Sequence, residues 1–188
     1  ALTIAGSDSG GGAGIQADLK SFSARGVYGA SVITAVTAQN TRLVIRVEAI
    51  SPAMIRAQID AVLSDIRIDA IKIGMLATSA VIDAVADGLA DFRGPIVLDP
   101  VMVAKSGDAL LQDDAVSCLI DRLLPRASLL TPNIPEAERL LSGKGDLTPQ
   151  EQGKALLALG PAAILMKGGH ADGAVCNEGP SPSSTKCA

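Results

Sequence analysis

A glycine-rich segment near the start of the chain offers backbone amide groups for binding a ligand. Residues 6–14 read Gly-Ser-Asp-Ser-Gly-Gly-Gly-Ala-Gly, follow an apolar run, and precede a helix expected to open at about Ala13. Glycines allow close backbone approach, and N–H groups at a helix N-terminus suit an anion or a polar substrate edge. A flexible turn is the alternative, which five glycines in nine residues disfavour. The segment fits neither the G-x-x-x-x-G-K-[ST] phosphate loop nor the G-x-G-x-x-G dinucleotide pattern.

The run Asn133-Ile-Pro-Glu136 has two interpretations. Asn followed three residues later by Glu is a capping box that opens a helix. The same carboxylate, placed at the carboxyl end of a strand, suits a magnesium–phosphate group. Both interpretations can hold together.

Two further segments place charged groups after apolar runs. Asp99 directly follows the apolar run 95–98, and there it would orient magnesium-bound water. Lys105 would neutralise phosphate charge. The alternative for these residues is a helix N-cap or a surface ion pair. In Lys167-Gly168-Gly169-His170 the lysine would steady nucleotide phosphates, and the glycines would let the backbone lie against a base or ribose. A solvated loop is the alternative there, and the lone histidine is assigned no catalytic role.

Asp18 and Met75 are weaker candidates for the same site. Asp18 lies one helical turn beyond Gly14 and would point back toward a crevice, although an isolated helix acid would be unremarkable. Met75 ends an apolar run, although a methionine there more often packs in a core.

Short apolar runs bounded by Gly, Pro, Asp or Asn recur along most of the chain, as is typical of strands buried on both faces. The predicted strands are Leu2–Ala5, Ser31–Ala38, Ala70–Met75, Pro95–Asp99, Ala127–Thr131 and Ala162–Lys167. Apolar residues three and four positions apart predict helices between them. These are Ile55, Ile59, Val62 and Leu63, opened by Ser51 and Pro52; Val81, Ile82, Val85 and Leu89; and Val116, Leu119, Ile120 and Leu123.

Strands alternating with helices predict an α/β fold, with a mostly parallel sheet and helices on both faces. Ligands of such sheets lie outside the carboxyl ends of the strands. We therefore expect the polar groups that follow the strands to converge on one crevice. They are Gly6–Asp8, Gln39–Thr41, Met75, Asp99, Thr131–Asn133 and Lys167–His170.

The composition narrows the class of partner. The chain has 188 residues, 48% hydrophobic and 19% charged, with a formal net charge of −4 and no Trp. This length fits one domain, and an acidic chain with few aromatic residues disfavours nucleic acid and anionic membranes as partners. No apolar stretch approaches the roughly 18 residues of a membrane span, and no signal peptide is visible. The chain has three cysteines, and this odd count favours a reduced, cytoplasmic setting.

Six blocks in order along residues 1–170 together resemble the hydroxymethylpyrimidine/phosphomethylpyrimidine kinases, a ribokinase-like family. They are Ala1–Lys20, Ser31–Thr41, Lys72–Leu76, Leu98–Gly107, Leu130–Ala137 and Met166–His170. The resemblance implies a ribokinase-like kinase domain over residues 1–170, followed by an irregular tail over 171–188. It also implies ATP- and Mg²⁺-dependent phosphorylation of 4-amino-5-hydroxymethyl-2-methylpyrimidine, and then of its monophosphate, for thiamine biosynthesis, with a homodimer considered as the assembly.

The match also implies residue roles. Gln39 would hydrogen-bond the aminopyrimidine, in a pocket lined by Gly6, Ala13, Asp18, Met75 and Val101. On the nucleotide side the match places Asn133 and Glu136 near magnesium and the phosphates, and Lys167, Gly168 and Gly169 near the nucleotide. The argument from charge adds Lys105 to the ATP-binding residues and Asp99 to the metal site.

The sequence departs from the family in two places. The family continues into a Gly-Thr-Gly-Cys-Thr segment that supplies the anion hole and the proposed catalytic cysteine, and nothing here matches it, so no catalytic residue is assigned and the C-terminal part of the fold is expected to be missing. Leu43 stands where the family usually has Gly. A pyridoxal or pyridoxine kinase, and a non-catalytic pyrimidine-binding relative, are the alternatives.

Overall fold

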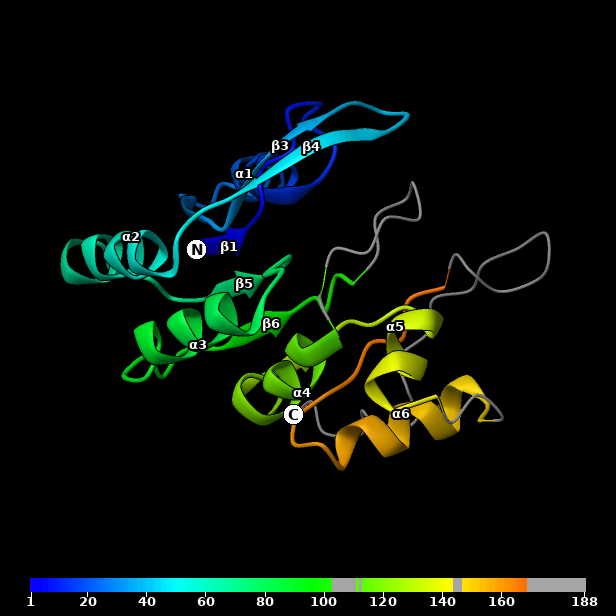
Figure 1. Ribbon diagram of the computed structural model, residues 1–188. Helices are drawn as coiled ribbons and strands as arrows, with labels where there is room; N and C mark the ends of the chain where they lie inside the picture. The colour runs from blue at the N-terminus through cyan, green and yellow to red at the C-terminus, as the bar shows by residue number, and fades with distance from the viewer. Residues whose placement is uncertain (103–110, 112, 144–146, 169–188) are drawn as a thin grey trace.

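The computed structural model describes residues 1–102, 111, 113–143 and 147–168. Lys105, Gly169, His170 and the predicted tail 171–188 therefore lie outside the described residues. Within them, the chain forms a parallel sheet covered by helices, and a separate antiparallel hairpin (Figure 1).

The parallel sheet has five strands in the order β2-β1-β5-β6-β7. Their bounds are β1 Leu2–Ala5, β2 Ala30–Ile33, β5 Ile71–Ile73, β6 Ile96–Leu98 and β7 Leu129–Leu130. Most apolar side chains of the three central strands, such as Ile4, Ile73 and Leu98, are buried. Burial on both faces is the reason these strands are continuous apolar runs in the sequence, and the α/β prediction is confirmed.

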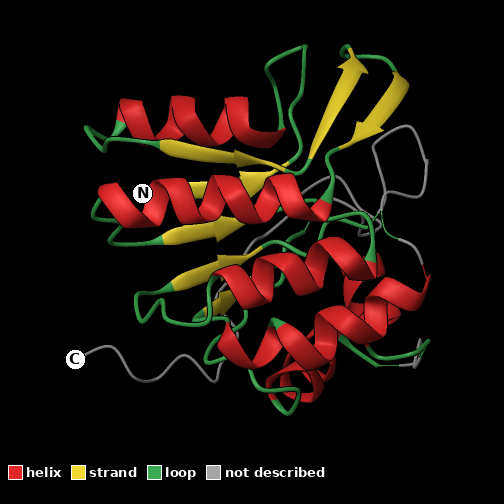
Figure 2. Ribbon diagram, turned by 60° about the vertical axis from the view of Figure 1, so that its left-hand side comes forward, coloured by secondary structure: helices red, strands yellow, loops and turns green. Residues whose placement is uncertain are grey.

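In the described part of the chain, six helices accompany the sheet: α1 Gly14–Ala24, α2 Pro52–Asp65, α3 Ser79–Gly88, α4 Asp113–Arg122, α5 Ile134–Leu140 and α6 Pro149–Leu157. A 3₁₀ turn, Leu124–Arg126, follows α4. The strand order reverses direction at β1, so right-handed crossovers place α1 on one face and α2, α3 and α4 on the other. Figure 2 shows the latter helices in front of the strands. Among the described residues, none of the helices combines the length and apolar character that crossing a bilayer requires.

Local caps fix where several helices begin. The Ser51 side chain accepts a hydrogen bond from the N–H of Met54, and Pro52 occupies the first turn of α2, as predicted. The predicted capping box of Asn133 and Glu136 opens α5. The interpretation of this run as a helix start is confirmed.

The predicted strand Ser31–Ala38 is wrong as a single element. It divides at Thr34 into β2 and β3 (Ala35–Gln39), and β3 pairs antiparallel with β4 (Val44–Ala49), which was not predicted. Buried Thr34 makes the break: its N–H donates to Ala5, its carbonyl accepts from Ile50, and its hydroxyl donates to the Met75 carbonyl at 2.7 Å. The chain leaves the sheet there, and the hairpin projects beyond the carboxyl ends of the parallel strands (Figure 2).

The predicted strand Ala162–Lys167 is present only as two parallel bridges, Leu130 to Ile164 and Asn133 to Lys167. Pro132 lies between the bridged positions of the neighbouring segment. Because proline has no N–H, a regular ladder cannot run through it. The bridge at Lys167 still brings this residue beside the start of α5.

Candidate active site

A cavity of about 520 Å³ lies at the carboxyl edge of the sheet. Its walls come from the end of β1 and the glycine-rich loop, from α1, from the end of β3 and the hairpin turn, and from the ends of β5 and β6. All six residues that the sequence assigned to substrate binding line it, and Asp99 does as well: Gly6, Ala13, Asp18, Gln39, Met75, Val101 and Asp99. Cavities of this size hold small molecules.

The glycine-rich loop is organised by Asp8, a residue that sequence reasoning did not single out. Its buried carboxylate accepts hydrogen bonds from the N–H groups of Gly10 (2.7 Å), Gly12 (2.9 Å) and Ala13 (2.8 Å). The amides of Gly12 and Ala13, next to the start of α1, thus donate to Asp8 in this structure. Binding of a ligand by this segment stays a prediction. An aspartate two residues before a glycine run was the available signal, because Asp side chains readily accept bonds from the following backbone.

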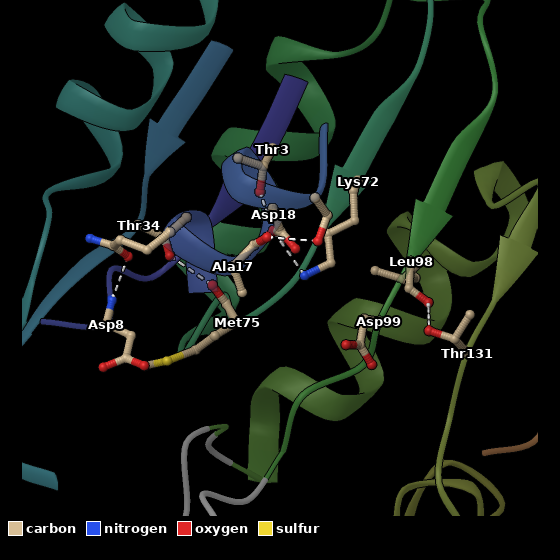
Figure 3. A network of polar contacts seen from close by, with 12 residues as sticks. Thr3, Asp8, Ala17, Asp18, Thr34, Lys72, Met75, Leu98, Asp99 and Thr131 are labelled. Atoms are coloured by element: carbon tan, nitrogen blue, oxygen red, sulfur yellow. Dashed lines mark hydrogen bonds and ion pairs between the residues drawn. The ribbon is translucent and has the colours of Figure 1, made fainter. Parts of the chain in front are cut away.

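Asp18 points into a polar cluster on the cavity floor (Figure 3). Its Oδ2 accepts a hydrogen bond from the Thr3 hydroxyl at 2.6 Å and pairs with Lys72 Nζ at 3.1 Å. Both charged side chains are about one-fifth exposed, 17% for Asp18 and 24% for Lys72. Lys72 was not predicted as a site residue, although a lone charge between Ile71 and Ile73 in an apolar strand could have indicated it.

Met75 lines the cavity next to Gly6 of the glycine-rich loop. Its Sδ would lie 3.3 Å from a Cβ at position 6, so a side chain there would crowd the thioether. Gly6 therefore leaves room for Met75, whose carbonyl is held by Thr34 (Figure 3).

Gln39 ends β3 at the cavity wall and is partly exposed. Its Oε1 lies 3.4 Å from the Thr37 hydroxyl, a long hydrogen bond, and its side-chain NH₂ has no hydrogen-bond acceptor among the described residues. The amide is therefore available to donate to a ligand.

Leu43, where the family usually has Gly, fits the hairpin turn without strain. The Asn40 side chain accepts from the N–H groups of Arg42 (2.8 Å) and Leu43 (3.1 Å), and the Leu43 carbonyl accepts from Asn40. Among the described non-glycine residues, only Ala77 and Ser142 have a positive φ. A glycine is not required at position 43.

Lys167 joins two carboxylates from different strand ends. Its Nζ lies 2.6 Å from Asp99 Oδ1 and 3.7 Å from Glu136 Oε2. The same Glu136 oxygen accepts the N–H of Asn133 at 2.8 Å within the capping box. Burial raises the pKa of Glu136, and the hydrogen bond from Asn133 and the charge of Lys167 oppose this rise.

The predicted residues thus fall into two groups that share Asp99. One group surrounds the cavity, and the other, Asn133, Glu136 and Lys167 with Gly168 beside it, lies at the ends of β6 and β7. Lys105 and Gly169 are outside the described residues.

The two carboxylates suit a metal only together with other ligands. No group of three His, Cys, Asp or Glu side chains that could hold a metal occurs within the described ranges. Mg²⁺ in nucleotide sites is usually bound by one or two carboxylates plus substrate phosphates and water. Asp99 and Glu136 fit that pattern, with Lys167 between them.

Comparison with known proteins identifies the family. The family model described as phosphomethylpyrimidine kinase matches residues 8–180. The chain belongs to this family. It is 58% identical over 176 residues to the hydroxymethylpyrimidine/phosphomethylpyrimidine kinase of Escherichia coli, covering 92% of this chain and 66% of that protein.

Solved structures agree with this assignment. The phosphomethylpyrimidine kinase of Clostridium difficile is 50% identical, with a TM-score of 0.83 over 92% of this chain and 76% of that one. A pyridoxal kinase from Staphylococcus aureus in complex with AMP-PCP is more distant, with 33% identity and a TM-score of 0.79 over 90% of this chain and 63% of that one. The ribokinase-like fold is confirmed. The chain spans about two-thirds of the length of its E. coli relative.

Proposed function

We propose that this chain carries the substrate pocket of a kinase that transfers the γ-phosphoryl group of ATP to the hydroxymethyl oxygen of 4-amino-5-hydroxymethyl-2-methylpyrimidine. The monophosphate would be the second substrate, and the diphosphate would serve thiamine biosynthesis. A homodimer and a cytoplasmic location stay predictions of the sequence.

The observation that carries the proposal is the position of Asp99. It lines the cavity and also pairs with Lys167, so a ligand in the cavity lies next to the cluster assigned to the nucleotide. Phosphoryl transfer requires the acceptor oxygen and the phosphates to be positioned together while charge is neutralised. Lys167 would neutralise phosphate charge, and Mg²⁺ bound with ATP would supply further charge neutralisation beside Asp99 and Glu136.

The cavity chemistry suits an aminopyrimidine. A primary amide both donates and accepts, so Gln39 can bind a ring nitrogen and the adjacent exocyclic amine at once. The Asp18 carboxylate on the cavity floor adds an acceptor, and Met75 adds a polarizable apolar surface.

A pyridoxal kinase is the second candidate, because the pyridoxal kinase of Staphylococcus aureus aligns over most of the described fold. Its substrate also carries a hydroxymethyl group on an aromatic ring, but it has no exocyclic amine beside a ring nitrogen. Gln39 therefore favours the pyrimidine.

The test is calorimetric titration of the full-length protein with hydroxymethylpyrimidine, pyridoxal and ADP, in wild type and Gln39→Ala. We expect the variant to bind the pyrimidine more weakly by about 1–3 kcal/mol, because ring groups are left unpaired, and to bind ADP unchanged. An unchanged pyrimidine Kd would contradict the pocket assignment. Tighter binding of pyridoxal than of the pyrimidine to wild type would favour the second candidate.

A further inference from the structure

Three hydroxyl side chains join the glycine-rich loop to β3. The N–H of Ser7 donates to the Ala35 carbonyl at 2.8 Å, and the Thr37 hydroxyl donates to the Ser7 carbonyl at 2.8 Å while the Thr37 N–H donates to Ser7 Oγ at 3.3 Å. Two residues further along both segments, the Ser9 side chain forms hydrogen bonds with the backbone of Gln39. We call Ser7, Ser9 and Thr37 the hydroxyl ladder, because their side chains replace part of a backbone ladder.

Ser9 satisfies both backbone groups of Gln39. The N–H of Gln39 donates to Ser9 Oγ at 2.8 Å, and the Ser9 hydroxyl donates to the Gln39 carbonyl at 2.6 Å. Ser9 is exposed, so its side chain contributes little to core packing. Its contacts fix the backbone from which the Gln39 amide projects.

The end of the hairpin depends on this attachment. β3 and β4 form a sheet of their own, and β4 is exposed along most of its length. Over the described residues, the hydrogen bonds that tie the hairpin between Val36 and Ala49 to the rest of the molecule come from Ser7 and Ser9 alone. The other attachments lie at the opposite end of the hairpin, where the Ala35 carbonyl accepts from the N–H of Ser7 and Thr34 donates to the carbonyls of Ala5 and Met75.

The loop that carries Ser9 is itself held firmly. Asp8, between the two serines, accepts the backbone N–H groups of Gly10, Gly12 and Ala13. The hydrogen bonds of Asp8 therefore hold the backbone at Ser9 in place, and Ser9 in turn holds the end of β3.

We propose that Ser9 is a positioning residue that sets the Gln39 amide against the pyrimidine ring without touching the substrate. This inference rests on the proposed function, because it takes Gln39 to be the residue that binds the ring. Loss of the Ser9 hydroxyl frees the end of β3, so a smaller fraction of the protein holds the amide in the binding orientation. Pyrimidine affinity falls, and nucleotide affinity stays the same because Lys167 and Asn133 lie on other elements.

A double-mutant cycle tests the inference by titrating hydroxymethylpyrimidine and ADP into full-length Ser9→Ala, Gln39→Ala and the double variant. We expect Ser9→Ala to raise the pyrimidine Kd by about tenfold and to leave the ADP Kd unchanged. Because Ser9 acts through Gln39, we expect the double variant to bind no more weakly than Gln39→Ala. Ser9→Thr retains the hydroxyl and is expected to stay within about threefold of wild type. Ser64→Ala, which removes an exposed helix serine, is the control.

Three results would overturn the positioning role: wild-type pyrimidine affinity in Ser9→Ala, equal losses in Ser9→Thr and Ser9→Ala, or additive losses in the double variant. If Gln39→Ala binds the pyrimidine as wild type does, the proposed function fails as well. The titration of Gln39→Ala therefore distinguishes failure of the proposed function from failure of the positioning role of Ser9.

Discussion

At the scale of single residues, Lys167 is the cation that connects Asp99 with Glu136. The lysine is 31% exposed, and Glu136 is nearly buried at 7%. Glu136 combines two roles, because one of its oxygens caps α5 while its charge faces Lys167. The two interpretations of Asn133-Ile-Pro-Glu136 are therefore geometrically compatible.

Glu136→Gln separates these two roles. Gln completes a capping box as Glu does, so we expect the free energy of unfolding to change by less than about 1 kcal/mol. Loss of the charge beside the phosphates is expected to reduce kcat by about 10²-fold. Turnover assays at varied Mg²⁺ and urea unfolding measure the two effects.

Glu151→Gln is the matched control, because Thr148 and Glu151 form the same capping box at the start of α6, away from the cavity. Its kcat should equal that of wild type. A mainly thermal defect in Glu136→Gln, with kcat retained, would show that Glu136 serves the helix alone.

The raised pKa of Glu136 also predicts a pH dependence. Its protonated form is favoured by folding, so its contribution to stability is fully present below the unfolded pKa and is lost as pH rises through the raised folded pKa. Urea unfolding of wild type and Glu136→Gln across this range should therefore show wild type losing stability relative to the variant as pH rises. A constant difference would contradict the effect of burial.

Residues that follow a strand could be predicted as site residues because parallel strands bring their carboxyl ends to one edge. Met75 and Asp99 were found in this way, and they line one cavity. Gln39 was predicted by the same argument and lines the cavity too, but it ends β3 of the antiparallel hairpin, so the hairpin brings it there and the parallel sheet does not. Asp8 was expected at this edge, but its role in the loop was missed, as was Ser9 altogether. Both act through contacts with backbone groups, which residue type alone does not reveal.

At the scale of elements, the glycine-rich loop depends on Gly14. Its φ is +54°, and a Cβ there would lie 2.2 Å from the Gly6 carbonyl oxygen. The loop therefore passes too close to the first turn of α1 for any side chain at this position.

Gly14→Ala is expected to lower the free energy of unfolding by at least about 3 kcal/mol, since strain in φ adds to a backbone clash. Gly26→Ala is the control, because Gly26 has a φ of +69° but nothing within 4 Å of its added Cβ. The control should lose only about 1–2 kcal/mol. Equal losses in urea unfolding would show that the clash at position 14 is relieved by movement of the loop.

The parallel strands were predictable and the hairpin was not, for the same physical reason. A strand buried on both faces, such as β1, is continuously apolar. β4 alternates Ile45 and Val47 with charged residues and is largely exposed, so it lacks the continuous apolar run by which the buried strands were predicted. The break at Thr34 was missed because a buried threonine fits a strand, and its hydrogen bonds to three other segments are visible only in the fold.

At the scale of the whole molecule, the reversal of strand order at β1 explains where the cavity lies. Strands on either side of β1 are connected across opposite faces, which opens a crevice above their carboxyl ends. The hairpin closes one side of this crevice, and the ends of β6 and β7 bring the Lys167 cluster to the other. Substrate and nucleotide groups thus meet at Asp99.

The most direct measurement is transfer of the γ-phosphoryl group from labelled ATP to hydroxymethylpyrimidine by the full-length protein with Mg²⁺, with pyridoxal as competing acceptor. The account predicts labelled pyrimidine monophosphate as the main product. Tight binding of the pyrimidine without transfer, or label found chiefly on pyridoxal, would contradict it.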